Sequence, residues 1–318
     1  MDTNSKTQVS DPSRRLLVLV GPTASGKTPI SLLIASRLNV EIISADSRQV
    51  YKYLDIGTAK PSPDDRKRVP HHFIDVVLPD KDFNAGEFGK QGREVIEEIF
   101  RRKKTPLVVG GSGLYVQALI DGFFEGPSAD QSVRKLLYER LKNEGAESLL
   151  SELNIVDPPA ASKMLPSNVR RIIRALEVYQ LTGTPISKLQ QERISFHFTP
   201  CVVGLLWDRN ILYERIDTRT EWMLQQGLIE EVKRLQESGY SPKLNALQTV
   251  GYKEVFDYLH GNINYERMVE LIKQNSRRYA KRQLTWFRRD RRIRWFEVHS
   301  EHEFPSVAEH IVKHFSSC

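Results

Sequence analysis

The stretch Leu16–Ser31, LLVLVGPTASGKTPIS, decides the fold of this chain. An apolar run leads into a loop bounded by two glycines, and a helical pattern follows. The loop fits the pattern G-x-x-x-x-G-K-[ST], in which backbone N–H groups and a helix N-terminus surround a phosphate. The sequence therefore predicts a phosphate-binding loop made of Gly21, Pro22, Thr23, Ala24, Ser25, Gly26, Lys27 and Thr28.

Two side chains of this phosphate loop are predicted to act on the anion directly. Lys27 supplies a positive charge for terminal phosphate oxygens, and the hydroxyl of Thr28 is the expected ligand of a Mg²⁺ ion. Gly21 and Gly26 permit backbone shapes that turn several N–H groups toward one anion. The pattern indicates bound phosphate without identifying the reaction.

A carboxylate follows the next predicted strand, EIISAD, at residues 41–46. Asp46 could hold Mg²⁺ through water, act as a base toward the acceptor of a group transfer, or cap the following turn. The strand end LVVGGS, residues 107–112, carries no acid, which weakens an ATPase interpretation. Ligands of parallel α/β sheets bind at the carboxyl ends of strands, so Gly21, Asp46 and Ser112 are expected at one edge.

The order of patterns predicts two domains. Strand and helix patterns alternate through the first third, whereas helical patterns fill the region before the apolar run Cys201–Trp207. This favours an α/β, P-loop NTPase-like core with a parallel sheet covered by helices, plus an all-helical insertion domain. The expected bounds are a flexible tail at 1–13, the core at 14–123 and 199–318 with a basic helical C-terminal part, and the insertion at 124–198.

Charge is concentrated in one part of the chain. The net charge of the 318 residues is +7, and Arg277–Trp295 alone holds nine Lys or Arg against Asp290. A local basic excess of this kind is typical of a nucleic-acid surface. No apolar run approaches the length of a membrane span, and the polar N-terminus lacks a signal-peptide core. These features predict a cytoplasmic protein without a membrane partner.

The two cysteines are too few for a disulfide framework or a cysteine-rich zinc module. Cys201 is expected to be a small core residue and Cys318 an exposed one. Two histidine pairs could share a helix face, but no thiol is expected beside either, so no metal site is predicted at His299 and His302 or at His310 and His314.

Seven motifs occur in an order that resembles the tRNA dimethylallyltransferases, also called tRNA isopentenyltransferases. They are GPTASGKT, ISADSRQVYKYLDIGTAKP, PHHFIDV, VVGGSGLY, RRIIRALEVY, QTVGYKE and YAKRQLTWFR, and the resemblance covers about residues 16–297. The short insertion and the lack of a Cys/His zinc finger resemble bacterial members. At Ser112 this chain has serine where the family usually has threonine, which keeps the hydroxyl.

The resemblance implies a reaction and its catalytic residues. The family transfers a dimethylallyl group from dimethylallyl diphosphate to the exocyclic amine of the adenosine 3′ of the anticodon, in tRNAs that read U-initial codons. The loop would then bind a diphosphate leaving group, together with Arg219. Asp46 would accept the proton of the amine. Arg215, one turn before Arg219, is the competing candidate for the diphosphate contact. Lys27 and Thr28 complete the implied catalytic set.

The resemblance also implies a set of tRNA contacts. They are Asp46, Ser47, Arg48, Gln49 and Ser112 around the adenine, Arg134, Arg170, Arg171 and Arg174 in the insertion, and Gln248, Gly251, Tyr252, Lys253, Lys281, Arg282, Gln283, Trp286 and Arg288 in the C-terminal part. Tyr279 and Trp295 are further aromatic candidates for base stacking. The implied partners are the tRNA anticodon stem-loop and dimethylallyl diphosphate, the implied cofactor is Mg²⁺, and the expected state is a monomer.

Three alternatives remain open at this stage. An adenylate isopentenyltransferase acting on AMP or ADP fits the phosphate loop and Asp46 equally well, but leaves the helical insertion and the basic stretch unexplained. A P-loop small-molecule kinase that binds ATP fits only the first 120 residues. A non-enzymatic RNA-binding protein fits the basic stretch but gives Lys27, Thr28 and Asp46 no role.

Overall fold

The computed structural model describes residues 14–122, 127, 130–191 and 197–318. They divide into two compact units, one within Met1–Ile120 plus Phe196–Cys318 and the other within Asp121–Ser195. The predicted tail at 1–13 and most of the predicted break that begins near Phe123 lie outside the described residues.

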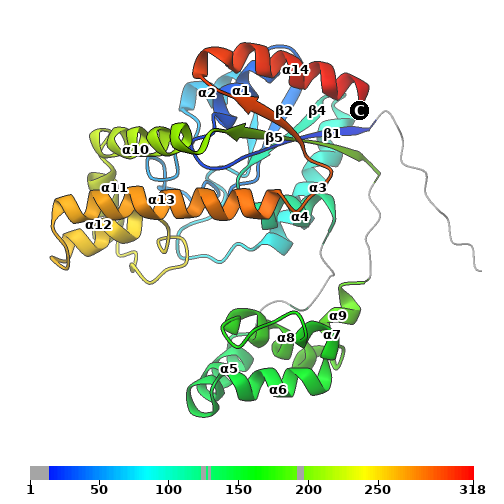
Figure 1. Ribbon diagram of the computed structural model, residues 1–318, viewed down its shortest axis with the longest axis vertical. Helices are drawn as coiled ribbons and strands as arrows, with labels where there is room; N and C mark the ends of the chain where they lie inside the picture. The colour runs from blue at the N-terminus through cyan, green and yellow to red at the C-terminus, as the bar shows by residue number, and fades with distance from the viewer. Residues whose placement is uncertain (1–13, 123–126, 128–129, 192–196) are drawn as a thin grey trace, which may run out of the picture. The chain divides into compact units, whose positions relative to one another are not determined.

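A parallel sheet forms the centre of the first unit (Figure 1). Its order is β3-β2-β4-β1-β5-β6, and every neighbouring pair is parallel. Strand β1 lies between β4 and β5 and is fully buried from Leu16 to Val20, as its unbroken apolar run predicts. The strands are β1 Arg15–Val20, β2 Val40–Ser44, β3 His71–His72, β4 Thr105–Gly110, β5 Thr199–Trp207 and β6 Arg294–Val298.

Helices cover both faces of this sheet (Figure 1). One face carries α1, Lys27–Ala35, and α14, Phe304–Ser317, which share a core with alternate residues of β1 and β5. The other face carries α3, Ala85–Arg101, and α4, Gly113–Ile120. The short helix α2 spans Pro63–Arg68. The predicted α/β class with a P-loop-like core is therefore confirmed.

Four further helices lie between β5 and β6 in the sequence. They are α10 Arg209–Gln225, α11 Leu228–Glu237, α12 Tyr252–Leu259 and α13 Tyr265–Phe287, and a single 3₁₀ turn, Glu301–Glu303, precedes α14. Helix α13 packs against both α10 and α12. Strand β6 was not predicted, because its sequence RWFEV is short and interrupted by charge.

The second unit is wholly helical in its described part. It contains α5 Gln131–Glu144, α6 Ala146–Val156, α7 Pro158–Ala161, α8 Val169–Thr182 and α9 Ile186–Leu189. Leu137, Leu149, Leu153, Ile172 and Leu176 form its core. The unit thus has a hydrophobic core of its own, as a separately packed domain requires.

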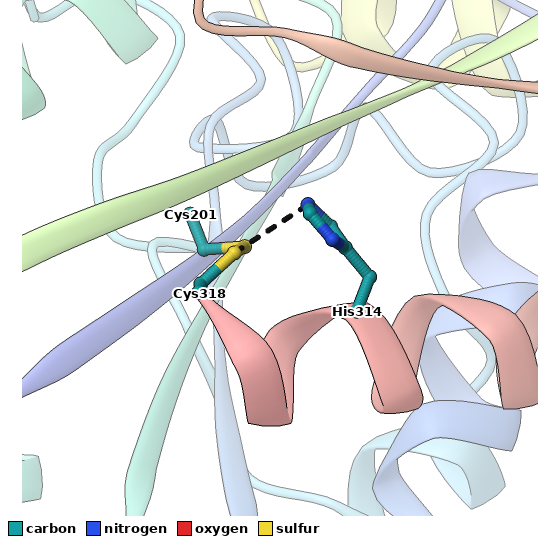
Figure 2. A group of neighbouring side chains, drawn as sticks. All are labelled: Cys201, His314 and Cys318. Atoms are coloured by element: carbon teal, nitrogen blue, oxygen red, sulfur yellow. Dashed lines mark hydrogen bonds between the residues drawn. A yellow bond between two sulfur atoms is a disulfide. The ribbon is translucent and has the colours of Figure 1, made fainter.

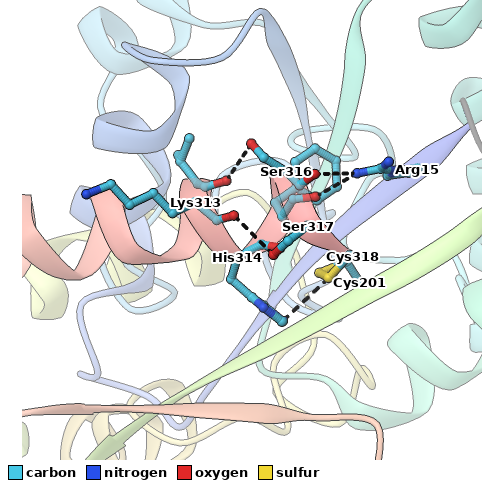
Figure 3. The surroundings of a disulfide bond; sticks show 9 residues. Arg15, Cys201, Lys313, His314, Ser316, Ser317 and Cys318 are labelled. Atoms are coloured by element: carbon cyan, nitrogen blue, oxygen red, sulfur yellow. Dashed lines mark hydrogen bonds between the residues drawn. A yellow bond between two sulfur atoms is a disulfide. The ribbon is translucent and has the colours of Figure 1, made fainter.

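Cys201 is buried in the core and Cys318 is exposed, as expected, but their pairing was not predicted. Cys201 and Cys318 are joined by a disulfide, although 117 positions separate them (Figure 3). Arg15, at the start of β1, donates to the carbonyls of Phe315 and Ser316 at 3.1 and 3.0 Å, so the end of α14 lies at the amino edge of the sheet. Cys201 is near the start of β5 at that same edge. Tertiary packing, which composition does not reveal, brings the two sulfurs together.

Candidate active site

The phosphate loop connects the end of β1 to the start of α1. Ala24 and Gly26 adopt positive φ values of 61° and 84°. Lys27 Nζ lies over the loop and donates to the carbonyls of Gly21 and Pro22 at 3.0 and 2.7 Å. The hydroxyl of Ser25 is buried and has no hydrogen-bond partner among the described residues. A lysine, a helix N-terminus and a buried free hydroxyl converge here, which suits an anion.

Lys27, Arg219 and Asp46 are coupled electrostatically. Burial and the Arg219 guanidinium lower the pKa of Lys27 to about 7, and Asp46 opposes that shift. Burial also lowers the pKa of Arg219, while Asp46 acts in the opposite direction. The structure therefore brings the predicted arginine of α10 into the same electrostatic environment as the lysine that follows β1 and the carboxylate that follows β2, at the carboxyl side of the sheet. Arg219, Lys27 in the protonated form that a bound anion favours, and one carboxylate can together bind a diphosphate and take a proton.

Asp46 also shapes the loop in which it lies. Its Oδ1 accepts from the N–H of Arg48 at 2.8 Å and from that of Gln49 at 3.4 Å, so the turn-capping role considered from sequence is present as well. The Arg48 guanidinium donates to the carbonyl of Asn245 at 2.7 Å. The capping contacts fix the position of the carboxylate.

Ser112 meets the Asp46 loop from the end of β4. Its Oγ accepts from the N–H of Ser47 at 3.0 Å and lies 3.2 Å from the Ser47 hydroxyl. Tyr279 of α13 contacts the same serine, and burial together with Asp46 raises its pKa to about 12. Tyr279 was predicted only as one of several stacking aromatics, because its helical spacing equally fits core packing. The structure places it beside the carboxylate.

Gln283 does not lie on the surface predicted to contact tRNA. Its side chain is buried, accepts from the N–H of Thr23 at 2.8 Å and donates to the carbonyl of Gly111 at 2.9 Å. It therefore ties the phosphate loop to the end of β4. Trp286, one turn away, is half-buried against Gly113, where a Cβ would lie 2.1 Å from the indole. The sequence showed the basic face of α13 but not which polar residue turned inward.

Tyr252 is likewise a core residue, contrary to the predicted tRNA contact. It is fully buried, and its hydroxyl donates to Glu231 Oε1 at 2.5 Å. Glu231, buried on α11, also accepts from the N–H groups of Asp55, Ile56 and Gly57 at 2.8–3.3 Å. This carboxylate anchors the loop that follows Asp46. Glu231 was not predicted, since a lone acid on a helix gives no signal of burial.

Two other predicted tRNA contacts are engaged within the first unit. The amide of Gln49 accepts from Ser44 Oγ at 3.0 Å and donates to the carbonyls of Thr58 and Ala59, both at 3.2 Å. The amide of Gln248 donates to the carbonyl of Pro242 at 2.7 Å. Gly251 is a buried helix cap with φ of 97°. The predicted residues that are exposed in this unit are Gln248, Lys253, Lys281, Arg282 and Arg288.

The four arginines of the helical unit that were predicted to contact tRNA fall into two pairs. Arg134 and Arg174 both bind Glu177, which is fully buried, at 3.0 and 2.7 Å. A buried carboxylate needs such partners, so these two arginines have a structural role. Arg170 and Arg171 are exposed at the start of α8 and line a cavity of about 630 Å³ with Tyr138 and others.

Side chains that could ligate a metal fall in two places. At the carboxyl side of the sheet the candidates are the Thr28 hydroxyl of the phosphate loop and the Asp46 carboxylate that follows β2, and such oxygen donors suit Mg²⁺. Elsewhere, His314 Nε2 lies 3.4 Å from the Cys318 sulfur (Figure 2), so a cysteine does accompany this histidine, although as a disulfide sulfur and not as a thiol. Both sulfurs are committed to the disulfide, and burial and Arg294 lower the pKa of His314.

A separate cavity of about 640 Å³ lies at the opposite, amino edge of the sheet. Arg15, Lys104, Thr105 and Phe315 are among its lining residues. It contains none of the residues coupled to Asp46. Among the described residues, no helix combines the length and the apolar character required to cross a bilayer.

Comparison with known proteins identifies the family. The model of the IPP transferase family matches residues 49–290. The tRNA dimethylallyltransferase 2 of Geotalea uraniireducens is 45% identical over 304 residues, covering 95% of this chain and 97% of that protein. The tRNA dimethylallyltransferase of Pelotomaculum thermopropionicum is 46% identical over 303 residues, covering 94% and 95% respectively.

Solved structures agree with these relatives. The full-length tRNA isopentenylpyrophosphate transferase of Bacillus halodurans is 40% identical with a TM-score of 0.70, covering 96% of this chain and 97% of that one. A eukaryotic dimethylallyltransferase, described as acting on tRNA, is 28% identical with a TM-score of 0.79, covering 96% and 79%. The chain therefore belongs to the IPP transferase family and matches tRNA dimethylallyltransferases along nearly its whole length.

Proposed function

We propose that this protein transfers the dimethylallyl group of dimethylallyl diphosphate to the exocyclic amine of the adenosine 3′ of the anticodon in tRNAs reading U-initial codons. The observation that carries the proposal is the shared electrostatic environment of Lys27, Arg219 and Asp46. An alkyl transfer to an amine needs a base as well as positive charge beside the diphosphate, and these three side chains supply both. Similarity to tRNA dimethylallyltransferases along the chain supports tRNA as the acceptor.

The chemistry requires one bond to form and one to break. The amine nitrogen attacks the allylic carbon, the carbon–oxygen bond to the diphosphate breaks, and Asp46 takes the proton that the nitrogen loses. Negative charge grows on the departing diphosphate. Loop N–H groups, Lys27 and Arg219 offset that charge, and preorganised donors of this kind are often the largest contribution to catalysis. Ser47, which follows Asp46 in the chain, and Ser112, whose Oγ accepts from the Ser47 N–H, are the proposed contacts of the adenine.

Mg²⁺ bound through the Thr28 hydroxyl would add further positive charge beside the diphosphate. Exposed Lys281, Arg282 and Arg288 of the first unit, and Arg170 and Arg171 of the helical unit, are the proposed phosphate contacts of the tRNA. Because such contacts are electrostatic, they favour a polyanion over a free nucleotide. We place the reaction in the cytoplasm, with a single chain as the working enzyme.

A direct assay tests this proposal. The purified protein is incubated with Mg²⁺, labelled dimethylallyl diphosphate and either total tRNA or AMP. Label in tRNA alone is the expected result, and nuclease digestion should place it on adenosine. Label in AMP instead would establish the adenylate isopentenyltransferase alternative, and label in neither would refute the proposed transfer.

A further inference from the structure

The outer side of the phosphate loop is held by side chains that do not face the anion. Arg215 Nε of α10 donates to the carbonyl of Ala24 at 2.9 Å, and Trp207 Nε1 donates to the carbonyl of Ser25 at 3.0 Å. Ala24 has a φ of 61°, which a residue with a side chain keeps only where its surroundings enforce it. Two consecutive carbonyls of the loop are thus held from one side.

The planarity of the peptide bond gives these contacts a functional consequence. In a trans peptide the C=O and the following N–H point in opposite directions, and no cis peptide occurs among the described residues. Holding the carbonyls of Ala24 and Ser25 therefore sets the direction of the N–H groups of Ser25 and Gly26. Both N–H groups belong to the part of the loop expected to surround phosphate. The Ser25 N–H also donates to the Pro22 carbonyl at 3.3 Å, so the Gly26 N–H is the group whose direction matters most for the anion.

Arg215 is itself oriented by the segment before and within α14. Its Nη1 binds Glu301 Oε1 at 2.6 Å, and its guanidinium carbon lies 4.2 Å from the ring centre of Trp207 and 5.7 Å from that of Phe304. Phe304 also presses on Gly26, where a Cβ would lie 2.5 Å from the phenyl ring. One planar guanidinium thus bonds a carbonyl and a carboxylate while stacking on an indole. Lysine, a point charge, cannot satisfy all three.

We propose that Arg215 is a positioning residue, oriented by Glu301, that holds the phosphate loop in its diphosphate-binding conformation. The inference rests on the proposed function, and it gives Arg215 and Arg219 different roles. Arg219 shares the electrostatic environment of Lys27 and Asp46. Arg215 also adds its charge to that environment and lowers the pKa of Arg219, but its contacts are with the backbone of the loop, Glu301 and Trp207.

The test compares Arg215→Ala, Arg215→Lys, Glu301→Gln and the double variant Arg215→Ala/Glu301→Gln. Calorimetry gives the Kd for dimethylallyl diphosphate, a filter assay gives the Kd for tRNA, and thermal unfolding gives Tm. Glu309→Gln is the matched control, because Glu309 makes an ion pair with Lys313 at 2.7 Å on α14 without touching the loop.

Loss of the hydrogen bond from Arg215 should weaken diphosphate binding about tenfold in Arg215→Ala. Arg215→Lys should not restore it. Glu301→Gln should weaken binding about two- to fivefold, the range for a partly exposed ion pair, with Tm close to wild type. The double variant should match Arg215→Ala, because Glu301 acts through Arg215. The Kd for tRNA and the Glu309→Gln variant should be unchanged.

Other results would overturn the inference. If Arg215 bound the diphosphate directly, Arg215→Lys would partly restore the affinity for dimethylallyl diphosphate. Glu301→Gln would then leave that affinity unchanged or increase it. If the ion pair between Arg215 and Glu301 served only the fold, the Kd for dimethylallyl diphosphate and the Kd for tRNA would both rise and Tm would fall. Wild-type affinity in Glu301→Gln and Arg215→Ala would also refute it. A wild-type protein that binds no dimethylallyl diphosphate would instead count against the proposed function.

Discussion

At the scale of the residue, surroundings decide the role more than residue type does. Arg215 and Arg219 lie one turn apart on α10, and the sequence offered both for the diphosphate. Arg215 has a loop carbonyl and Glu301 as partners, whereas Arg219 is coupled to Asp46. Glu231 and Gln283 are comparable cases, since both are polar and both are buried as cross-links between segments.

The base role of Asp46 gives a prediction at this scale. Asp46→Asn keeps the size of the side chain and an oxygen that can accept from Arg48, but it cannot take a proton. Turnover should fall about 10²–10⁴-fold, the usual contribution of a general base, while the Kd for tRNA stays within a few-fold. Single-turnover transfer and tRNA binding are the measurements. Asp64→Asn, at an exposed ion pair on α2, is the control, and near-normal turnover of Asp46→Asn would remove Asp46 from the mechanism.

At the scale of the element, strand β2 carries a charged cluster as well as apolar residues. Glu41 is 4% exposed and contacts Arg102, His72 and Lys104 at 2.7, 2.8 and 3.1 Å. Burial alone would raise the pKa of the Glu41 carboxyl, but hydrogen bonds from these three partners outweigh it and lower the pKa to about 2. The carboxylate therefore stabilises the fold while it is ionised.

This cluster predicts a pH dependence of stability. Because the pKa of Glu41 is lower in the folded state, its contribution is present above about pH 4.5 and is lost as the pH falls toward 2. A shift of this size corresponds to roughly 3 kcal/mol. Urea unfolding of wild type and Glu41→Gln should show the wild type more stable at pH 7, with the gap closing below pH 4. A gap that stays constant across that range would contradict the assignment.

Helix α13 shows how one element serves two purposes. Ala280, Gln283 and Phe287 face the core, while Lys281 and Arg282 on the same turns are exposed. The inward residues hold the phosphate loop and the sheet, which leaves the outward charges available to a polyanion. The aromatic side chains of α13 also differ in their surroundings, since Phe287 is buried in the core and Tyr279 lies near Asp46.

The outward charges predict the salt dependence of tRNA binding. Lys281→Ala, Arg282→Ala and Arg288→Ala should each reduce the slope of log K against log salt by about 0.7–0.9 for every phosphate that the protein no longer neutralises. The slope is measured from tRNA binding at several salt concentrations. Lys233→Ala, an exposed residue of α11, is expected to leave the slope unchanged. Wild-type slopes in all three variants would show that these side chains touch no phosphate.

At the scale of the whole molecule, the C-terminal segment ties distant parts of the first unit together. Strand β6 completes the sheet, Phe304 packs on Gly26, and Cys318 closes a disulfide with β5 (Figure 3). Phe304, the first residue of α14, packs at the carboxyl side of the sheet, and Cys318, directly after α14, is bonded at the amino side. Both contacts join residues more than a hundred positions apart in the sequence.

The disulfide predicts a redox-dependent stability. Closing a loop of this length restricts the unfolded chain and typically contributes about 2–4 kcal/mol. The oxidised protein should therefore unfold at higher urea concentration than the protein kept in reductant. Cys318→Ser should match the reduced protein and lose the response to reductant. Equal midpoints for oxidised and reduced wild type would mean that the bond does not stabilise the fold.

The sequence alone determined the class of fold, the phosphate loop, the candidate base and the family, because each depends on local patterns: buried apolar runs, glycine spacing and motif order. Only the tertiary structure decided the roles of Arg215, Gln283, Tyr252 and Glu231 and the pairing of Cys201 with Cys318. Those features depend on which distant segments meet, and a polar side chain has the same letter whether it faces a substrate, a neighbouring carbonyl or solvent. Burial and partners, set by packing across the sheet, make the difference.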